Sequence, residues 1–221
     1  MTAEPLMAGK KGLIMGLAND KSIAWGIAQA LDAQGAQIAI SYQNEALEKR
    51  VVPLAEKLSF APTLIKCDVT DSASVEACFK ELGEKWGKID FVVHAIAFSD
   101  KDQLKGRTID TTLENFTNTM HISCYSFLEA CRCASPYMNE NGAIVTLTYL
   151  GSERVIWAAK EPCRTTILWA LPKLRWKLRY VMPRLIWDNR KSASMRFPPA
   201  RLKRWPLPAS AISARFCAGT S

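Results

Sequence analysis

The sequence predicts an α/β fold in which a doubly wound parallel sheet carries helices on both faces. Three observations support this prediction. Short apolar runs recur as far as residue 148, an amphipathic stretch separates each run from the next, and a glycine ends the first run. Parallel strands are buried on both faces and need helical crossovers, and such an alternation of strands and helices provides both.

The expected elements follow one another closely along the chain. A strand over residues 12–15 leads to a helix over 22–34, a strand over 37–42 to a helix over 44–58, and a strand over 63–66 to a helix over 72–86. A fourth strand over 91–94, a long helix over 112–137 and a fifth strand over 143–148 complete the regular part. We therefore expect residues 1–154 to form a truncated Rossmann-type, dinucleotide-binding domain with five recognisable strands.

The composition changes sharply at residue 154. Residues 1–153 carry 14 Lys and Arg against 19 Asp and Glu, whereas residues 154–221 carry 15 against 2. The second part also holds five of the seven Trp and seven of the eleven Pro. Pro172 and Pro183 interrupt its best helical stretch. We expect residues 155–221 to form an irregular or disordered basic tail.

Composition also narrows the class of protein. No run of about 18 uncharged apolar residues indicates a membrane span, and the first residues lack the pattern of a signal peptide. We therefore expect a cytoplasmic protein. Seven cysteines and two histidines are scattered without the paired spacing of metal ligands. Reduced thiols and no metal site are expected, with His94 and His121 in structural roles.

The segment after the first expected strand has the character of a phosphate-binding loop. Gly16 allows a tight backbone turn, and the helix that begins near Ser22 would direct its free N–H groups and its dipole at an anion. The spacing of Gly16, Ser22 and Gly26 differs from the common GxGxxG. On these residues alone, an ordinary strand-to-helix turn remains an alternative.

The loop resembles that of the NADH-dependent enoyl-acyl-carrier-protein reductases, divergent short-chain dehydrogenases of bacterial fatty acid biosynthesis. It reads glycine, five residues, Ser-Ile-Ala, one residue, Gly-Ile-Ala. Four further segments resemble the family in the same order, at residues 41–43, 67–69, 93–98 and 148–154. The resemblance therefore extends over most of the expected domain and is specific.

The resemblance implies a role for each matching residue. It places Gly16, Ser22 and Ile23 at the cofactor pyrophosphate, Gln43 at the adenosine ribose, Asp68 and Val69 at the adenine, Ile96 at the nicotinamide-side ribose, Ser99 at the substrate and Tyr149 at the catalytic centre. Many dinucleotide folds have an acid where this chain has a neutral amide, Gln43, and Arg50 lies too far along the chain to be an obvious phosphate clamp. NADH is therefore favoured over NADPH.

The reaction that the resemblance implies reduces a trans-2-enoyl thioester carried by acyl carrier protein. Hydride passes from NADH to the β-carbon, and a tyrosine hydroxyl stabilises the enolate oxygen. Tyr149 matches the earlier of the family's two active-site tyrosines. The second tyrosine and its lysine are replaced by Ala159 and Thr166. We therefore expect catalysis by this chain to be impaired.

A shifted reading frame would explain both the departure from the family and the unusual tail. With suitable codons, residues 164–173 read one base earlier encode Pro-His-Tyr-Asn-Ile-Met-Gly-Val-Ala-Lys, in which the tyrosine and lysine return at the family's spacing. Residues 157–164 can likewise encode a second Gly-Ser-Glu-Arg. We hypothesise that a short tandem duplication shifts the frame after about residue 156. The segment displaced would include the helix that builds the family's homotetramer, which places this assembly in doubt.

Two other functions remain open at this stage. In the tail, basic residues alternate with Trp169, Trp176, Trp187 and Trp205, a pattern that could bind single-stranded nucleic acid or another acidic surface. The frame hypothesis explains the same charge without such a partner, so nucleic-acid binding is disfavoured. A different short-chain reductase that acts on a small carbonyl compound is the other alternative. Such enzymes usually have an Asn-Ala-Gly run where this chain has residues 95–97.

Overall fold

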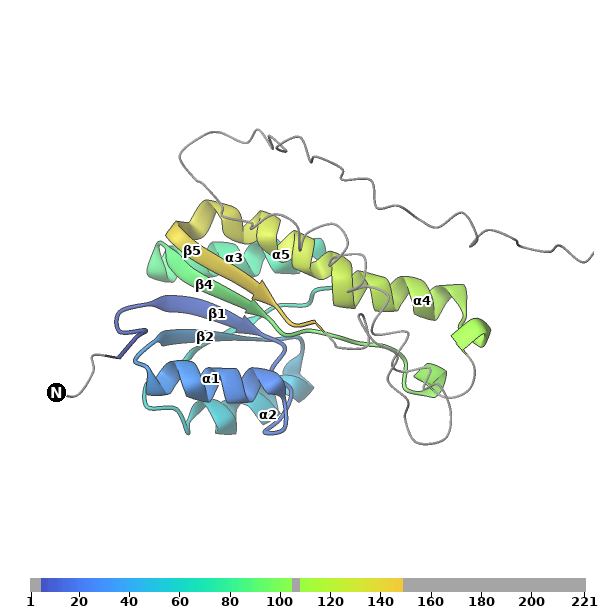
Figure 1. Ribbon diagram of the computed structural model, residues 1–221, viewed down its shortest axis with the longest axis horizontal. Helices are drawn as coiled ribbons and strands as arrows, with labels where there is room; N and C mark the ends of the chain where they lie inside the picture. Colours follow the sequence, from blue (N-terminus) through green and yellow to red (C-terminus); the bar gives the residue numbers. More distant parts are fainter. Residues whose placement is uncertain (1–4, 105–107, 149–221) are drawn as a thin grey trace, which may run out of the picture. The chain divides into compact units, whose positions relative to one another are not determined.

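The computed structural model describes residues 5–104 and 108–148 of the 221-residue chain. Within this part, five parallel strands form one sheet in the order β3-β2-β1-β4-β5 (Figure 1). The strands are β1 (Lys11–Met15), β2 (Gln37–Tyr42), β3 (Thr63–Lys66), β4 (Ile89–His94) and β5 (Met138–Thr146). The predicted parallel α/β sheet is confirmed. The tail predicted over residues 155–221 lies outside the described residues.

Helices cover both faces of the sheet, as the doubly wound fold requires. Figure 1 shows α1 (Ile23–Ala33) and α2 (Glu45–Ala55) on one face, and α3 (Ser72–Trp86) and α5 (Ser126–Ala134) on the other. The side chains of successive residues in β1 point to opposite faces of the sheet. Ile14 packs with α1 and α2, whereas Leu13 and Met15 pack with α3 and α5. This double coverage explains why the strand sequences are apolar throughout rather than alternating.

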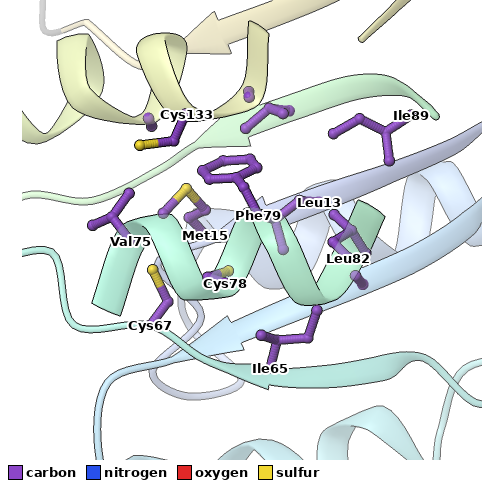
Figure 2. Close-up of a cluster of buried hydrophobic side chains, with 14 of the residues drawn as sticks. Leu13, Met15, Ile65, Cys67, Val75, Cys78, Phe79, Leu82, Ile89 and Cys133 are labelled. Atoms are coloured by element: carbon purple, nitrogen blue, oxygen red, sulfur yellow. The ribbon is translucent and has the colours of Figure 1, made fainter. Parts of the chain in front are cut away.

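The larger of the two cores lies between the sheet and helix α3. Val75, Cys78, Phe79 and Leu82 recur at helical spacing on one side of α3, and each is at most 1% exposed. Figure 2 shows the Phe79 ring among side chains from the strands and from α5. The apolar periodicity that predicted this helix therefore marks its buried face.

Polar side chains fix the beginnings of three helices. Asn44 caps α2 by accepting a hydrogen bond from the backbone N–H of Leu47 at 3.0 Å. Asp71 caps α3 in the same way, and Thr112 caps α4 (Leu113–Met120). These side chains satisfy N–H groups that have no partner within the helix. The predicted starts of these helices are confirmed to within one residue.

The long helix predicted over residues 112–137 is not continuous. It consists of α4, a π-helical turn η3 (His121–Tyr125), α5 and a short 3-10 turn η4 (Ser135–Tyr137). The predicted start of the fifth strand at residue 143 was also wrong, because β5 begins at Met138. The polar residues 139–142 have the composition of a turn, and Asn141 has a positive φ of 65°. Met138 nevertheless pairs with Ile89, so the strand begins before this polar segment.

Asp90 joins three strands at the amino edge of the sheet. Its carboxylate accepts hydrogen bonds from the Lys11 backbone N–H at 2.9 Å, from Lys10 Nζ at 3.1 Å and from Asn139 Nδ2 at 3.1 Å. Burial alone raises the pKa of Asp90, but these hydrogen bonds outweigh that effect and hold the pKa below its ordinary value. The charged form of Asp90 therefore stabilises the fold.

We predict that Asp90→Asn lowers the free energy of unfolding at pH 7 by about 1–3 kcal/mol, because the amide loses the charge-assisted bonds. Since the folded pKa is depressed, the stabilisation is present above the ordinary value of about 3.9 and is lost as the pH falls through the folded value. Urea unfolding at pH 7 and at pH 3 measures both effects. Glu84→Gln, on the exposed side of α3, should leave stability unchanged, and equal losses in both variants would contradict the prediction.

Candidate functional site

Four of the predicted cofactor-contacting segments lie at the same edge of the sheet. Gly16 follows β1, Gln43 follows β2, Asp68 comes just after β3, and Ile96 comes just after β4. The strands are parallel, so all four segments emerge at the carboxyl edge. Successive strands are added to one side of β1 as far as β3 and to its other side from β4 onward, so the topological switch point lies between β1 and β4. Ligands of open α/β sheets bind at such a switch point, outside the carboxyl ends of the strands. Tyr149, the predicted catalytic residue, lies outside the described residues.

Gly16 occupies a position that only glycine fits. Its φ is +97°, and a Cβ built there would lie 2.3 Å from the backbone oxygen of Ala95. The Ala95 N–H in turn donates to the Met15 carbonyl at 3.0 Å, which joins the ends of β4 and β1. The backbone therefore turns away from the sheet directly beside the loop that holds Ile96, as the predicted phosphate-binding loop requires.

Ser22 shapes the loop rather than capping the helix. Its hydroxyl accepts hydrogen bonds from the backbone N–H groups of Ala18 at 3.2 Å and Asn19 at 3.0 Å. Helix α1 consequently begins with no side-chain cap and no acidic residue in its first turn, and Ile23 at its start is 68% exposed. A helix start of this kind attracts an anion through its N–H groups and its dipole.

Gln43 and Asp68 form a polar pair across the ends of β2 and β3. Gln43 Nε2 lies 3.2 Å from both carboxylate oxygens of Asp68, while the Thr70 backbone N–H and hydroxyl donate to Oδ1 at 2.9 Å and 2.7 Å. Burial raises the pKa of Asp68, but the bonds from Thr70 and Gln43 and the charge of Lys66 outweigh it, so the pKa is lowered. Asp68 therefore keeps a negative charge beside Gln43 at neutral pH.

The side chains of the other predicted site residues are buried or half-buried, which leaves little of them for direct contact with a cofactor or substrate. The Val69 side chain is 6% exposed and belongs to the core, so its backbone is the part left for a ligand. Ile96 is half-buried against the same core. Ser99 is buried, and its hydroxyl accepts a hydrogen bond from Thr119 at 3.0 Å and exchanges longer bonds with Asn115. A role of Ser99 at the substrate stays a prediction.

Sequence reasoning missed a row of polar side chains that holds β4 and the loop after it. Asn115 Oδ1 accepts from the Asp100 backbone N–H, Thr119 bonds Ser99, and Ser123 bonds both the N–H and the carbonyl of Phe98. The row continues to Ser126, which meets the ring of His94. The available signal was the recurrence of small polar residues every three or four positions from residue 115. These residues fix the loop that contains Ile96.

His94 is a structural residue, as predicted. Its side chain is fully buried at the end of β4, with Nε2 2.8 Å from Ser126 Oγ and Nδ1 3.3 Å from Thr146 Oγ1. The ring also packs edge-on against Phe127, with centroids 5.5 Å apart. His94 thus joins β4, β5 and α5. His121 packs against the ring of Tyr125 in the π-helical turn.

The described cysteines are free thiols, and burial raises the pKa of several. Cys67, Cys78 and Cys133 belong to the core between the sheet and helices α3 and α5, and the pKa of Cys131 is raised to about 11. Burial raises the pKa of Cys131 and of Cys133, so these two thiols stay protonated and unreactive at neutral pH. Residues 5–104 and 108–148 contain no cluster of three or more potential metal ligands, and none of the helices described there is long and apolar enough to cross a membrane.

A parallel sheet with a glycine turn at its switch point and an uncapped helix start beyond that turn is an arrangement typical of dinucleotide-binding α/β domains. Comparison with protein families gives a narrower assignment. The family model described as "Enoyl-(Acyl carrier protein) reductase" matches residues 16–163, two thirds of the chain. The chain belongs to this enoyl-acyl-carrier-protein reductase family, and the resemblance seen in its sequence motifs is confirmed.

Individual relatives agree with this assignment. Enoyl-acyl-carrier-protein reductase (NADH) 1 of Rhizobium meliloti is 58% identical over 154 residues, which are 70% of this chain and 56% of that protein. The counterpart in Rickettsia felis is 52% identical over 151 residues, which are 68% of this chain and 58% of that protein. The chain therefore spans less than two thirds of the length of these curated relatives.

Solved structures show the same similarity. The reductase of Anaplasma phagocytophilum, in complex with NAD, aligns with a TM-score of 0.71 and 49% identity over 80% of this chain and 66% of that one. The Bacillus cereus reductase, with NADP+ and an indole naphthyridinone, aligns with a TM-score of 0.72 and 38% identity over 81% of this chain and 68% of that one. The two relatives were thus solved with different nicotinamide cofactors.

We predict that Gly16→Ala lowers the free energy of unfolding by about 2 kcal/mol or more, because it combines an unfavourable φ with a clash against the Ala95 backbone. Gly26→Ala, one turn into α1, is the matched control, since a Cβ there meets no atom within 4 Å. It should be neutral or slightly stabilising because alanine favours helix. Urea unfolding compares the two, and an unaffected Gly16→Ala variant would disprove the close approach.

Proposed function

We propose that this chain binds NADH at the carboxyl edge of its sheet as enoyl-acyl-carrier-protein reductases do. The uncapped start of α1 beside Gly16 is the observation that carries this proposal. It offers backbone N–H groups and a positive dipole to a pyrophosphate, with no acidic side chain in the first turn. Gln43 and Asp68 lie at the ends of the two strands beyond, where the adenosine half would extend. The names of the curated relatives, which specify NADH, support the same cofactor.

The Gln43–Asp68 pair favours NADH over NADPH. The amide of Gln43 can bond the ribose hydroxyls, whereas a 2′-phosphate would approach the ionised Asp68 carboxylate, held 3.2 Å from Gln43 Nε2. Two negative charges brought close together repel each other even in a partly solvated site. The preference therefore arises from a fixed negative charge and not only from the absence of a phosphate clamp.

We predict that the chain binds NADH more tightly than NADPH. Asp68→Asn should lower the ratio of the NADPH and NADH dissociation constants by about fivefold. A charge interaction of about 1 kcal/mol near the surface gives a change of this size. Glu56→Gln, with the same loss of charge at an exposed position after α2, should leave the ratio unaltered. Fluorescence titration of each nucleotide measures the dissociation constants. If Asp68→Asn leaves the ratio of the two dissociation constants unchanged, Asp68 does not contribute to the preference for NADH.

The parent reaction of this proposal is the reduction of a trans-2-enoyl thioester carried by acyl carrier protein. Bound NADH supplies the hydride, and the described residues bind and orient the cofactor. We further propose that this chain turns over close to the uncatalysed rate. The family's second tyrosine and its lysine are absent, since Ala159 and Thr166 occupy their positions. The positions of Tyr149 and of the residues after it lie outside the described part.

The frame hypothesis belongs to the same proposal. The family match ends at residue 163, and 15 of the 29 basic residues lie at or beyond residue 154. A shift after about residue 156 accounts for the missing tyrosine and lysine and for the basic Trp-rich and Pro-rich composition together. It makes a separate nucleic-acid-binding role for residues 155–221 unnecessary. The gene sequence across codons 145–170 must contain the hidden frame.

We predict that the chain oxidises NADH in the presence of crotonyl coenzyme A at a rate near background. The same gene with its frame restored after codon 156 should produce a chain that is faster by at least about a hundredfold, because the general acid and electrostatic contributions return. Absorbance at the NADH band follows both reactions. A normal rate from the unaltered chain would show that catalysis does not need the missing residues.

A further inference from the structure

Glu129 is a buried carboxylate that the proposed cofactor site does not use directly. It lies on α5, and its side chain is only 1% exposed. Oε2 has no hydrogen-bond partner among the described residues. Burying a carboxylate in this way is unfavourable unless its partners compensate, so the contacts of Glu129 indicate what it does.

The closest contact of Glu129 is to the first residue of α3. Ser72 Oγ donates to Glu129 Oε1 at 2.5 Å, the length of a strong hydrogen bond to a charged acceptor. Arg132 lies on the same helix as Glu129, with its guanidinium 3.7 Å from Oε1. The short bond therefore connects α5 to the start of α3, the helix that follows the predicted adenine-side loop.

The start of α3 and the loop before it are one hydrogen-bonded unit. The backbone N–H of Asp68 donates to Ser74 Oγ at 2.9 Å, and that of Asp71 donates to the Asp68 carbonyl at 3.2 Å. Asp71 also caps the Ala73 N–H at 3.0 Å. A shift of Ser72 would consequently move Asp68 and Val69, since these bonds couple the loop to the first turn of the helix.

A second link between the same two helices differs in its environment. Arg132 forms an ion pair with Glu76 at 2.9 Å, but both side chains are more than half exposed. Such surface pairs contribute little. The short bond from Ser72 to the buried carboxylate of Glu129 is therefore the link that can fix the beginning of α3.

We infer that Glu129 is a positioning residue for the adenosine end of the cofactor: through Ser72 it fixes the loop of residues 68–71 in the form that binds the nucleotide. The inference rests on the proposed NADH-binding function. It distinguishes Glu129 from an ordinary stabilising residue, because the buried charge is unfavourable for stability while its hydrogen bond orders the loop.

The experiment uses the full chain and three substitutions that separate these effects. Glu129→Met keeps the length of the side chain but removes the acceptor, and Ser72→Ala removes the donor. Glu129→Gln keeps an oxygen that Ser72 can bond. Glu76→Met is the matched control, since it makes the same replacement in the exposed pair between the same helices. Each variant is studied by amide hydrogen exchange at residues 68–73, by titration with ADP-ribose, which lacks the nicotinamide, and by thermal unfolding.

Glu129→Met and Ser72→Ala should each weaken ADP-ribose binding about fivefold, the equivalent of one hydrogen bond of ordinary net strength, and accelerate exchange at residues 68–73. The melting temperature of Glu129→Met should be unchanged or higher, since an apolar side chain of similar size replaces a buried charge. Glu129→Gln and Glu76→Met should resemble the unaltered chain in affinity and exchange.

Several results would overturn the inference. Normal affinity or normal exchange in Glu129→Met would show that Glu129 does not order the loop. A melting temperature that falls in step with affinity in Glu129→Met would indicate a merely stabilising role. If the unaltered chain binds neither NADH nor ADP-ribose, the proposed function is wrong and the inference falls with it. If the unaltered chain binds and Glu129→Met binds equally well, only the inference is wrong.

Discussion

The close approach of the β1 and β4 backbones at Gly16 is the constraint on which the rest of the described structure depends. No side chain fits between Gly16 and the Ala95 carbonyl, and the Met15 carbonyl bonds the Ala95 N–H there. The two strands flank the switch point of the sheet. Because the chain turns sharply at Gly16, α1 can begin just beyond the sheet edge, and the loop after β4 can run alongside.

The site is supported mainly by side chains that would not touch a cofactor. The polar row from Asn115 to Ser126 holds β4 and its loop, while Ser72, Ser74 and Asp71 hold the loop after β3. Both sets lie on or next to helices of the face covered by α3 and α5. That face of the sheet therefore both buries the larger core and positions the loops at the carboxyl edge, which explains why polar groups are retained beside an apolar core.

Family membership and the activity of this particular chain are separate questions. The family model matches residues 16–163, but the chain spans 56% of the length of the Rhizobium meliloti relative. In the proposed function the contacts to a dinucleotide come from successive strand ends, so the cofactor half alone would suffice for binding. Hydride transfer additionally needs groups beside the reacting carbon, and the residues at the corresponding positions, Ala159 and Thr166, have no comparable chemistry.

The sequence by itself determined the parallel α/β fold, the order of strands and helices, and the strand-end positions of Gly16, Gln43, Asp68 and Ile96, because these follow from apolar periodicity, turn residues and motif order. Tertiary contacts decided the rest. Pairing with Ile89 moved the start of β5 to Met138, and contacts with α4 buried Ser99 in the loop after β4. The contact between α5 and α3 brought Glu129 to Ser72. Such contacts join residues far apart along the chain, so no local pattern encodes them.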